Sequence, residues 1–249
     1  MGEHRLGEIL HSLRSEGRVA VAKLATTLSV SEETIRRDLA ELERRSLLRR
    51  VHGGAVPPRL DQEQPLIERG KHNMRSKARV GELAETLLSE GMSIFLDTGT
   101  TTLAFARRLV GKNITVTTNS IDIALLLGQS LARINLTPGA LRTKDNALVG
   151  YETIAYVGRY FYDMAFMGIG GCDISLGWMD YEEHESTLRQ AMRGRARRRV
   201  MLADFGKFDR QAYLKTFGLE EPLTVVCDRP PPQHFQQEFA LHEVDILHP

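Results

Sequence analysis

Apolar residues near the amino terminus recur at helical spacing and predict three short helices. They form stripes over residues 6–13, 21–28 and 35–42, with the i, i+3, i+4, i+7 spacing of an amphipathic helix. Gly17 interrupts the first stripe, and a tight connection separates the second helix from the third. Two short helices joined so closely predict a helix-turn-helix, in which the second helix enters the major groove of DNA.

The third helix, expected at residues 31–42, combines a face to bury with cations to present. Ser31 can cap this helix, because its hydroxyl can accept a hydrogen bond from a free backbone N–H of the first turn. Arg36 and Arg37 lie off the apolar stripe, so we expect them to contact DNA, with Ser31 and Thr34 beside them.

A basic segment follows at residues 46–56 and carries a Gly-Gly turn between small apolar residues, which predicts the β-hairpin wing of a winged helix. Arg49, Arg50, His52 and Gly53 are its candidate DNA contacts. The alternative is a solvated basic surface, the usual fate of a charge run. Six arginines within residues 36–50, next to a helix pair and a wing, favour DNA binding.

The rest of the chain alternates between strand-like and helix-like patterns. Residues 57–70 are polar and contain several prolines, which predicts a linker, and a long helix is expected from Lys71 to Gly91. The expected strands lie at 93–96, 114–117, 133–136, 164–167, 200–202, 224–226 and 244–247, and the expected helices at 103–109, 121–127, 152–162, 185–198 and 233–241. This alternation predicts an α/β domain with a mainly parallel sheet covered on both faces.

Ligands of open α/β sheets bind at the carboxyl ends of the strands, so the residues there are the candidate effector site. Residues 97–102 join an aspartate and a glycine to three threonines before a helix, which favours a phosphate cradle over simple helix capping. The expected effector-binding residues are Asp97, Gly99, Thr100, Thr101, Thr102, Thr118, Asn119, Ser120, Gly139, Gly170, Glu185, Arg189, Asp204 and Lys207. Five further arginines, between positions 193 and 199, are expected to form a solvated helix end.

Charge and composition add three constraints. Residues 1–60 carry 11 Lys and Arg against 8 Asp and Glu, a net +3, whereas the remainder carries 22 against 24, a net −2. The two cysteines cannot form a disulfide framework. A signal peptide and an apolar run of the ~20 residues that span a bilayer are both missing, so we expect a cytoplasmic protein with no membrane partner.

Two sets of motifs resemble the DeoR family of bacterial regulators. Residues 30–39 and 50–55 resemble its DNA-binding signature, and residues 97–101, 118–120 and 202–208 resemble its effector-sensing half in both pattern and order. The resemblance implies a sugar-phosphate sensor whose fold is similar to sugar-phosphate isomerases and CoA-transferases.

The acidic segment at residues 180–183 and the proline-rich segment at 228–232 resemble the glycerol-3-phosphate repressor branch of the same family. Glycerol 3-phosphate is therefore one candidate effector among phosphorylated sugars and polyols.

The expected organisation is a winged helix-turn-helix at residues 1–56, a linker at 57–70 and an effector-binding and oligomerisation domain at 71–249. The expected function is a transcriptional repressor that binds double-stranded operator DNA as a homo-oligomer, a dimer or a tetramer, without a cofactor or a metal. Two alternatives stay open here. One is an isomerase-like enzyme that uses Asp97, Glu185, Asp204 and Lys207 as acid–base groups. The other is a DNA-binding structural protein without a ligand.

Overall fold

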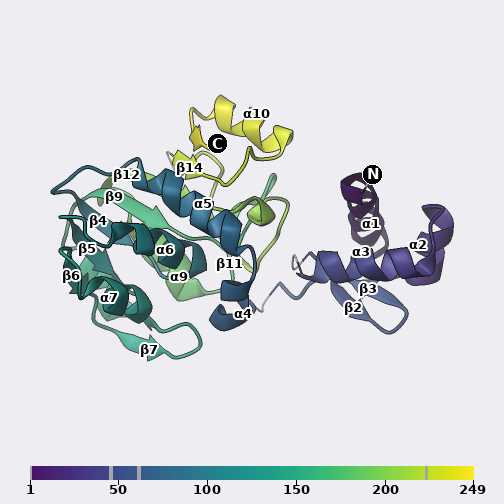
Figure 1. Ribbon diagram of the computed structural model, residues 1–249, viewed down its shortest axis with the longest axis horizontal. Helices are drawn as coiled ribbons and strands as arrows, with labels where there is room; N and C mark the ends of the chain where they lie inside the picture. Colours follow the sequence, from purple (N-terminus) through teal and green to yellow (C-terminus); the bar gives the residue numbers. More distant parts are fainter. Residues whose placement is uncertain (1, 45–46, 61–62, 222–223) are drawn as a thin grey trace. The chain divides into compact units, whose positions relative to one another are not determined.

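Two units, Met1–Gln62 and Glu63–Pro249, make up the chain in the computed structural model (Figure 1). The structure describes residues 2–44, 47–60, 63–221 and 224–249. No described helix is long and apolar enough to cross a membrane. The first unit holds the predicted helix-turn-helix and the second the predicted α/β sheet, and each is described by itself.

Three helices and a small antiparallel sheet form the first unit. The helices are α1 (Gly2–Glu16), α2 (Val21–Thr27) and α3 (Glu32–Arg44), and the strands are β1 (Val19–Ala20), β2 (Arg49–Val51) and β3 (Gly54–Val56), in the order β1-β3-β2. The three expected stripes bury their apolar residues in one core, where Ile9, Ile35, Leu39 and Leu42 are almost fully buried. The three helices and the hairpin are confirmed. Strand β1 was not predicted, because two residues are too few to show a period of two.

A bidentate ion pair joins the first and third helices beside this core. The Arg5 guanidinium on α1 donates to both carboxylate oxygens of Asp38 on α3, at 2.5 and 3.0 Å. Such fork-to-fork geometry fixes orientation as well as distance. The helix that is expected to read DNA is therefore held by apolar packing and by a directional charge pair.

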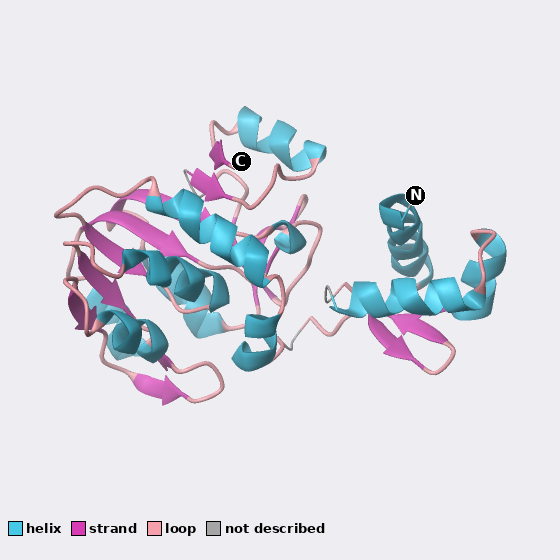
Figure 2. Ribbon diagram, in the orientation of Figure 1, coloured by secondary structure: helices cyan, strands magenta, loops and turns pink. Residues whose placement is uncertain are grey.

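A seven-stranded, wholly parallel sheet forms the centre of the second unit, in the order β15-β14-β12-β9-β4-β5-β6 (Figure 2). Its strands are β4 (Ser93–Leu96), β5 (Thr115–Thr118), β6 (Arg133–Leu136), β9 (Tyr162–Met167), β12 (Ala196–Leu202), β14 (Thr224–Val226) and β15 (Asp245–Leu247). Every strand predicted for this sheet is present, so the fold class is confirmed.

Helices cover both faces of this sheet. Those on one face are α5 (Met74–Glu85), α6 (Thr100–Ala106) with the 3-10 turn η1 (Arg107–Leu109), and α7 (Ile121–Leu127). Those on the other are α8 (Tyr151–Val157), α9 (Glu183–Ala191) and α10 (Gln233–Leu241). Successive side chains of a strand point to opposite faces of the sheet, and β4 buries both faces: Ile94 and Leu96 pack against the first group of helices and Phe95 against the second.

Smaller strands extend beyond this sheet. The hairpin β7 (Ala140–Arg142) and β8 (Ala147–Val149) lies after β6, and β10 (Gly171–Asp173), β11 (Gly177–Asp180) and β13 (Leu214–Phe217) form an antiparallel sheet. These five strands were not predicted. Each is three or four residues long and pairs with a partner that is not obvious from local sequence.

Several element boundaries differ from the expectation. Two helices, α4 (Leu66–Lys71) and α5, replace the single helix expected from Lys71 to Gly91, and the segment assigned to the linker therefore contains α4. A left-handed residue, Asn73 (φ 54°), separates the two helices. Helix α8 ends at Val157, and Tyr162 already belongs to β9.

The arginine-rich segment after Arg189 is not a helix end. Helix α9 ends at Ala191, and Arg197, Arg198 and Arg199 belong to strand β12, at its exposed to half-buried amino end. The Arg198 guanidinium donates to the Thr224 hydroxyl at 2.6 Å and pairs with Asp245 at 2.9 Å. The expectation of a helix end is wrong, because residues 196–202 pair as a strand and acceptors at the starts of β14 and β15 bind Arg198.

We expect Leu39→Ala to lower the free energy of unfolding of the first unit by about 2–5 kcal/mol, because it leaves a cavity in the core. Leu39 is 1% exposed. Hydrogen exchange should accelerate in peptides of α1 and α3 and stay unchanged in β4 and β9. The matched control is Leu241→Ala, whose side chain in α10 is 77% exposed and should change stability by less than about 0.5 kcal/mol. Equal effects of the two substitutions would contradict this assignment of the core.

Candidate functional site

The candidate DNA-binding surface starts at the capped end of α3. The Ser31 hydroxyl accepts a hydrogen bond from the Thr34 backbone N–H at 3.2 Å and lies 2.9 Å from the Thr34 hydroxyl. Glu32 and Glu33 occupy the first turn, where the helix dipole favours negative charge. Ser31 therefore acts as the predicted cap, and both hydroxyls lie at the end of α3.

Two arginines project from the solvent side of α3. The Arg36 and Arg37 side chains are 55% and 79% exposed, whereas Ile35 on the opposite side of the helix is buried. Arg36 pairs with Glu32 at 2.5 Å, and Arg37 lies 3.4 Å from Glu33. Exposed pairs of this kind contribute about 0–1 kcal/mol, so both guanidinium groups can exchange a carboxylate for a DNA phosphate or a base edge.

The wing places a second set of donors next to α3. Arg49 and Arg50 lie on β2, His52 and Gly53 form the turn before β3, and the Arg50 Nε donates to Glu43 at 2.7 Å. A concavity of about 490 Å³ opens between α3 and the wing. Its lining residues are Val21, Ala22, Glu32, Arg36, Leu39, Arg50, Val51, His52, Gly53 and Gly54. The structure thus gathers the predicted DNA contacts on α3 and the wing; Arg45 and Ser46 lie outside the described residues.

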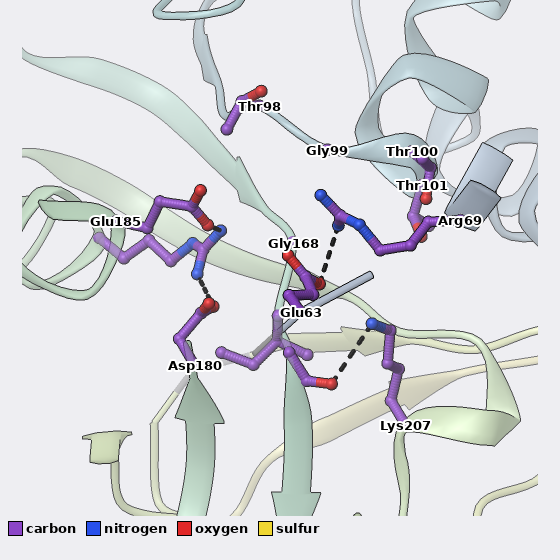
Figure 3. A pocket seen from close by; sticks show the side chains of 13 residues that line it. Glu63, Arg69, Thr98, Gly99, Thr100, Thr101, Gly168, Asp180, Glu185 and Lys207 are labelled. Atoms are coloured by element: carbon purple, nitrogen blue, oxygen red, sulfur yellow. Dashed lines mark hydrogen bonds and ion pairs between the residues drawn. The ribbon is translucent and has the colours of Figure 1, made fainter. Parts of the chain in front are cut away.

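The candidate effector pocket, called the sensor pocket below, lies at the carboxyl ends of β4 and β9, next to β11, α9 and the turn after β12 (Figure 3). Its lining residues are Glu63, Arg69, Thr98, Gly99, Thr100, Thr101, Gly168, Ile169, Gly170, Asp180, Glu185, Arg189 and Lys207. Seven of these are predicted effector residues: Gly99, Thr100, Thr101, Gly170, Glu185, Arg189 and Lys207. The free volume of about 20 Å³ admits about one water molecule, so a larger ligand needs side chains to move.

The loop at residues 98–101 forms one wall, and buried polar groups hold it from behind. Gly99 has φ +135°, a conformation that side chains rarely adopt, and so lets the backbone turn tightly into α6. The Thr98 N–H donates to Asp97 Oδ1 at 2.8 Å and to Asn119 Oδ1 at 3.1 Å. The Thr102 hydroxyl donates to the Gly99 carbonyl at 2.9 Å. Asp97, Asn119 and Thr102 therefore support the wall rather than line it.

A buried arginine forms the opposite wall. The Arg189 side chain is 3% exposed, and each of its guanidinium nitrogens donates to a different carboxylate: Asp97 at 2.5 Å, Glu185 at 2.9 Å, and Asp180. Burial raises the pKa of Asp97 to about 6, against the opposing charge of Arg189, and raises the pKa of Asp180 as well. Burial acts in the same direction on Glu185, but Arg189 and Arg142 outweigh it and lower the pKa of that carboxyl.

The third side of the pocket carries two cations that these carboxylates do not bind. Arg69 in α4 pairs with Glu63 at 2.9 Å and donates to the Gln64 carbonyl at 3.0 Å. The ammonium of Lys207, in the 3-10 turn η2 (Phe205–Lys207), lies 3.4 Å from the Gly170 carbonyl. Burial lowers the pKa of Lys207 to about 8. Arg69 and Lys207 are thus the cations best placed to meet an anion.

The remaining predicted effector residues lie outside the pocket lining. The Thr118 hydroxyl accepts from the Ser120 N–H at 3.1 Å, and the Ser120 hydroxyl caps α7. Gly139 has φ +143°, and a Cβ there would lie 2.7 Å from the Val149 carbonyl, so backbone packing explains this glycine. Asp204 accepts from the Asn73 amide at 2.9 Å and from the Gly206 N–H at 3.1 Å. These groups shape strand ends and turns.

The acid–base set of the alternative enzyme is not assembled in the pocket. Asp97 and Glu185 form ion pairs with Arg189. Lys207 lines the cavity, whereas Asp204 does not. Within the described part of the chain, no group of three or more His, Cys, Asp or Glu side chains could hold a metal ion. With Arg69 and Lys207 on one side, the pocket is a candidate site for an anion.

Sequence reasoning missed six lining residues. Thr98, Gly168, Ile169 and Asp180 adjoin predicted positions, so the rule that ligands bind at strand ends could have included them. Glu63 and Arg69 gave no such signal, because they precede the first strand in a segment whose composition predicts a linker.

Comparisons with known proteins agree with both units. A family model described as the DeoR-like helix-turn-helix domain matches residues 5–59, and one described as the DeoR C terminal sensor domain matches residues 72–229. The glycerol-3-phosphate regulon repressor of Escherichia coli (strain K12) is 29% identical over 96% of this chain and 95% of its own length. The HTH-type transcriptional regulator GlpR of Haloferax volcanii is 36% identical over 86% of this chain and 84% of its own.

Among solved structures, the ribose 5-phosphate isomerase A of Methanocaldococcus jannaschii is similar to this chain with a TM-score of 0.41 and 21% identity, over 55% of each chain. The full-length relatives named above are transcriptional regulators, in agreement with the expectation that this protein is not an enzyme.

We expect Arg189→Met to lower the free energy of unfolding of the second unit by about 3–5 kcal/mol at pH 7.5, because buried Asp97 and Asp180 lose their cation and Glu185 keeps only Arg142. The folded-state pKa of Asp97, about 6, already exceeds the ordinary 3.8, so this group favours the folded state less as the pH rises between these values. Loss of Arg189 raises that pKa further. The deficit should therefore be larger at pH 7.5 than at pH 5 in urea unfolding.

The matched control is Arg193→Met. This arginine lies just beyond the same helix, is half exposed and pairs with Glu221 at 2.5 Å, so its loss should cost less than about 1 kcal/mol. A deficit in Arg189→Met that is small, or equal at both pH values, would contradict the central role of this buried cation.

Proposed function

Because the chain belongs to the DeoR family of DNA-binding transcriptional regulators, we propose that it represses a carbohydrate or polyol catabolic operon under the control of a phosphorylated effector. One observation carries this proposal: a winged helix-turn-helix and an anion-binding pocket occur in the same chain. The named relatives include a glycerol-3-phosphate regulon repressor, which makes glycerol 3-phosphate the first effector to test.

The pocket supports a phosphate rather than a neutral sugar. Arg69 and Lys207 supply positive charge, and Thr100 and Thr101 line the same cavity at the start of α6. Charge-assisted hydrogen bonds of this kind are about twice as strong as neutral ones. The acidic wall formed by Asp180 and Glu185 suits sugar or polyol hydroxyls, which can donate to carboxylates.

We propose that the effector lowers operator affinity, with a coupling free energy of about 1–3 kcal/mol. A ligand shifts a conformational equilibrium only by its differential affinity for the two states. Arg69 precedes the sheet and Lys207 follows β12, so a phosphate held by both depends on the relative positions of distant segments.

We also propose a homo-oligomer, a dimer or a tetramer, that binds operator DNA in the cytoplasm. Helix-turn-helix proteins commonly bind as dimers whose half-sites lie about one helical turn of DNA, or a multiple of it, apart. A single recognition module of this size buries about 600–1,000 Å² on DNA, which is small for tight specific binding.

Arg36→Ala and Arg37→Ala should each weaken operator binding by about 1–3 kcal/mol if the lost contact is a bidentate contact to a base. The test is the affinity for a duplex selected by the wild-type protein from a random pool. Arg79→Ala is the matched control, since this exposed arginine pairs with Glu82 on helix α5 of the sensor unit. Wild-type affinity in both α3 variants would remove this helix from its assigned role.

Lys207 should make effector binding depend on pH. Its pKa of about 8 means that the cation is lost above pH 8, while a phosphate monoester, with a second pKa near 6, keeps its charge. Affinity for glycerol 3-phosphate should therefore fall by up to about tenfold per pH unit above 8. Lys207→Arg should show no such fall, because guanidinium stays protonated.

The pKa of Lys77 is also lowered to about 8 by burial, but this lysine is present in both proteins, so the difference between the two profiles reports Lys207. Lys207→Ala should bind the operator normally and lose the effector response. Parallel pH profiles in wild type and Lys207→Arg would show that Lys207 does not meet the ligand.

A further inference from the structure

A carboxylate from the start of the sensor unit already occupies its pocket. Glu63 lies on the segment that arrives from the DNA-binding unit, yet its side chain is only 8% exposed and lines the cavity. Figure 3 shows it between Arg69 and Lys207, beside Gly168. The Glu63 carboxylate lies 2.9 Å from Arg69 NH1.

The position of Glu63 is where an anionic ligand would be held. Arg69 and Lys207 are the cations whose charge acts most strongly on the Glu63 carboxyl. The third cation of the pocket, Arg189, is already bound to three carboxylates. Nearby Asp180 and Glu185 oppose its charge, and burial raises the pKa of Glu63. The carboxylate is therefore held against a desolvation cost and like-charge repulsion, and can be replaced by a better anion.

Space leads to the same conclusion. The cavity has about 20 Å³ free, too little for a phosphate group beside the Glu63 carboxylate. Arg69 is 18% exposed and reaches the cavity from the half-buried helix α4, so entry past Arg69 and Glu63 requires no movement of the sheet. Departure of Glu63 would free both the volume and the cation.

We propose that Glu63 is a built-in competitor of the effector, a tethered carboxylate that occupies the anion position until a phosphate displaces it. This inference rests on the proposed function, since it assumes that the pocket receives a phosphorylated ligand. Competition with Glu63 lowers the apparent affinity for the effector. It also means that effector binding releases the segment that leads to the DNA-binding unit.

Displacement changes the length of that segment. Residues 57–62 separate β3 from Glu63, and Pro65 caps α4, with its carbonyl accepting from the Arg69 N–H. When Arg69 turns to a phosphate it gives up both the Glu63 carboxylate and the Gln64 carbonyl, so the connection extends to residues 57–64. Two further residues add about 7 Å of reach. The chain beyond stays fixed, because the Lys77 ammonium donates to the carbonyls of Arg69 and His72 at 2.6 and 2.9 Å. Effector binding thus lengthens the tether of the DNA-binding unit.

The test compares Glu63→Gln with the wild-type full chain, using glycerol 3-phosphate and inorganic phosphate as probes in calorimetric titrations at pH 7.5. Glutamine keeps the size of the side chain and removes its charge. Affinity for both probes should rise about tenfold if the carboxylate leaves the pocket open one time in ten. Glu68→Gln is the matched control, because Glu68 on α4 is half exposed and pairs with Lys71 instead.

The direction in which Glu63→Gln changes the affinity for phosphate distinguishes a competitor from a residue that only supports the structure. Loss of a supporting ion pair would lower or leave unchanged the affinity for phosphate, and either result would overturn the inference while wild-type binding still supported the proposed function. Binding by Glu63→Gln alone would support the inference. Failure of every protein to bind either probe would overturn both.

Hydrogen exchange on the wild-type protein provides a test that needs no variant. Saturating glycerol 3-phosphate should accelerate exchange in a peptide spanning residues 63–66 and slow it at residues 98–101. Protection of both segments would mean that the ligand binds beside Glu63, and would overturn displacement.

Discussion

A single buried guanidinium, that of Arg189, holds together three elements around the sensor pocket. Its carboxylate partners come from the end of β4, from the end of β11 and from α9 itself. Three carboxylates so close together in a low-dielectric interior repel one another and lose hydration, so without a cation they would separate or take up protons. Arg142 also pairs with Glu185, but Asp97 and Asp180 depend on Arg189, and the Thr98 loop depends in turn on Asp97.

The same interaction divides the cations of the pocket into two kinds. Arg189 is engaged by the fold, whereas Arg69 and Lys207 have weaker or replaceable partners: one carboxylate and two carbonyls. These two residues lie far apart in sequence, before and after most of the sheet. An anion that binds both gains affinity only when α4 and the turn after β12 are correctly placed, which is how a ligand contact can become a conformational signal.

Sequence predicted most of the architecture because long periodic segments dominate it. The stripes of α1, α2 and α3 and the apolar strands of the parallel sheet carry their structure locally, and the strand-end rule located the Thr98–Thr101 wall. Short strands such as β1 and β10 could not be predicted, since their pairing is decided by distant partners. The arginines of β12 were misassigned because a charge run suggests a helix end in solvent, whereas acceptors on β14 and β15 bind Arg198 and the segment pairs as a strand.

Glu63 and Arg69 show most clearly what composition cannot reveal. Proline and polar residues around positions 57–65 predict a linker, and α4 contains no fully buried residue. The described contacts that hold Glu63 and Gln64 converge on one side chain, because Arg69 binds the Glu63 carboxylate and the Gln64 carbonyl. A segment attached by so few contacts lies at the low-stability end of a fold, where small free-energy changes decide its position. A ligand that competes for Arg69 therefore acts on the contact that fixes where the sensor unit begins.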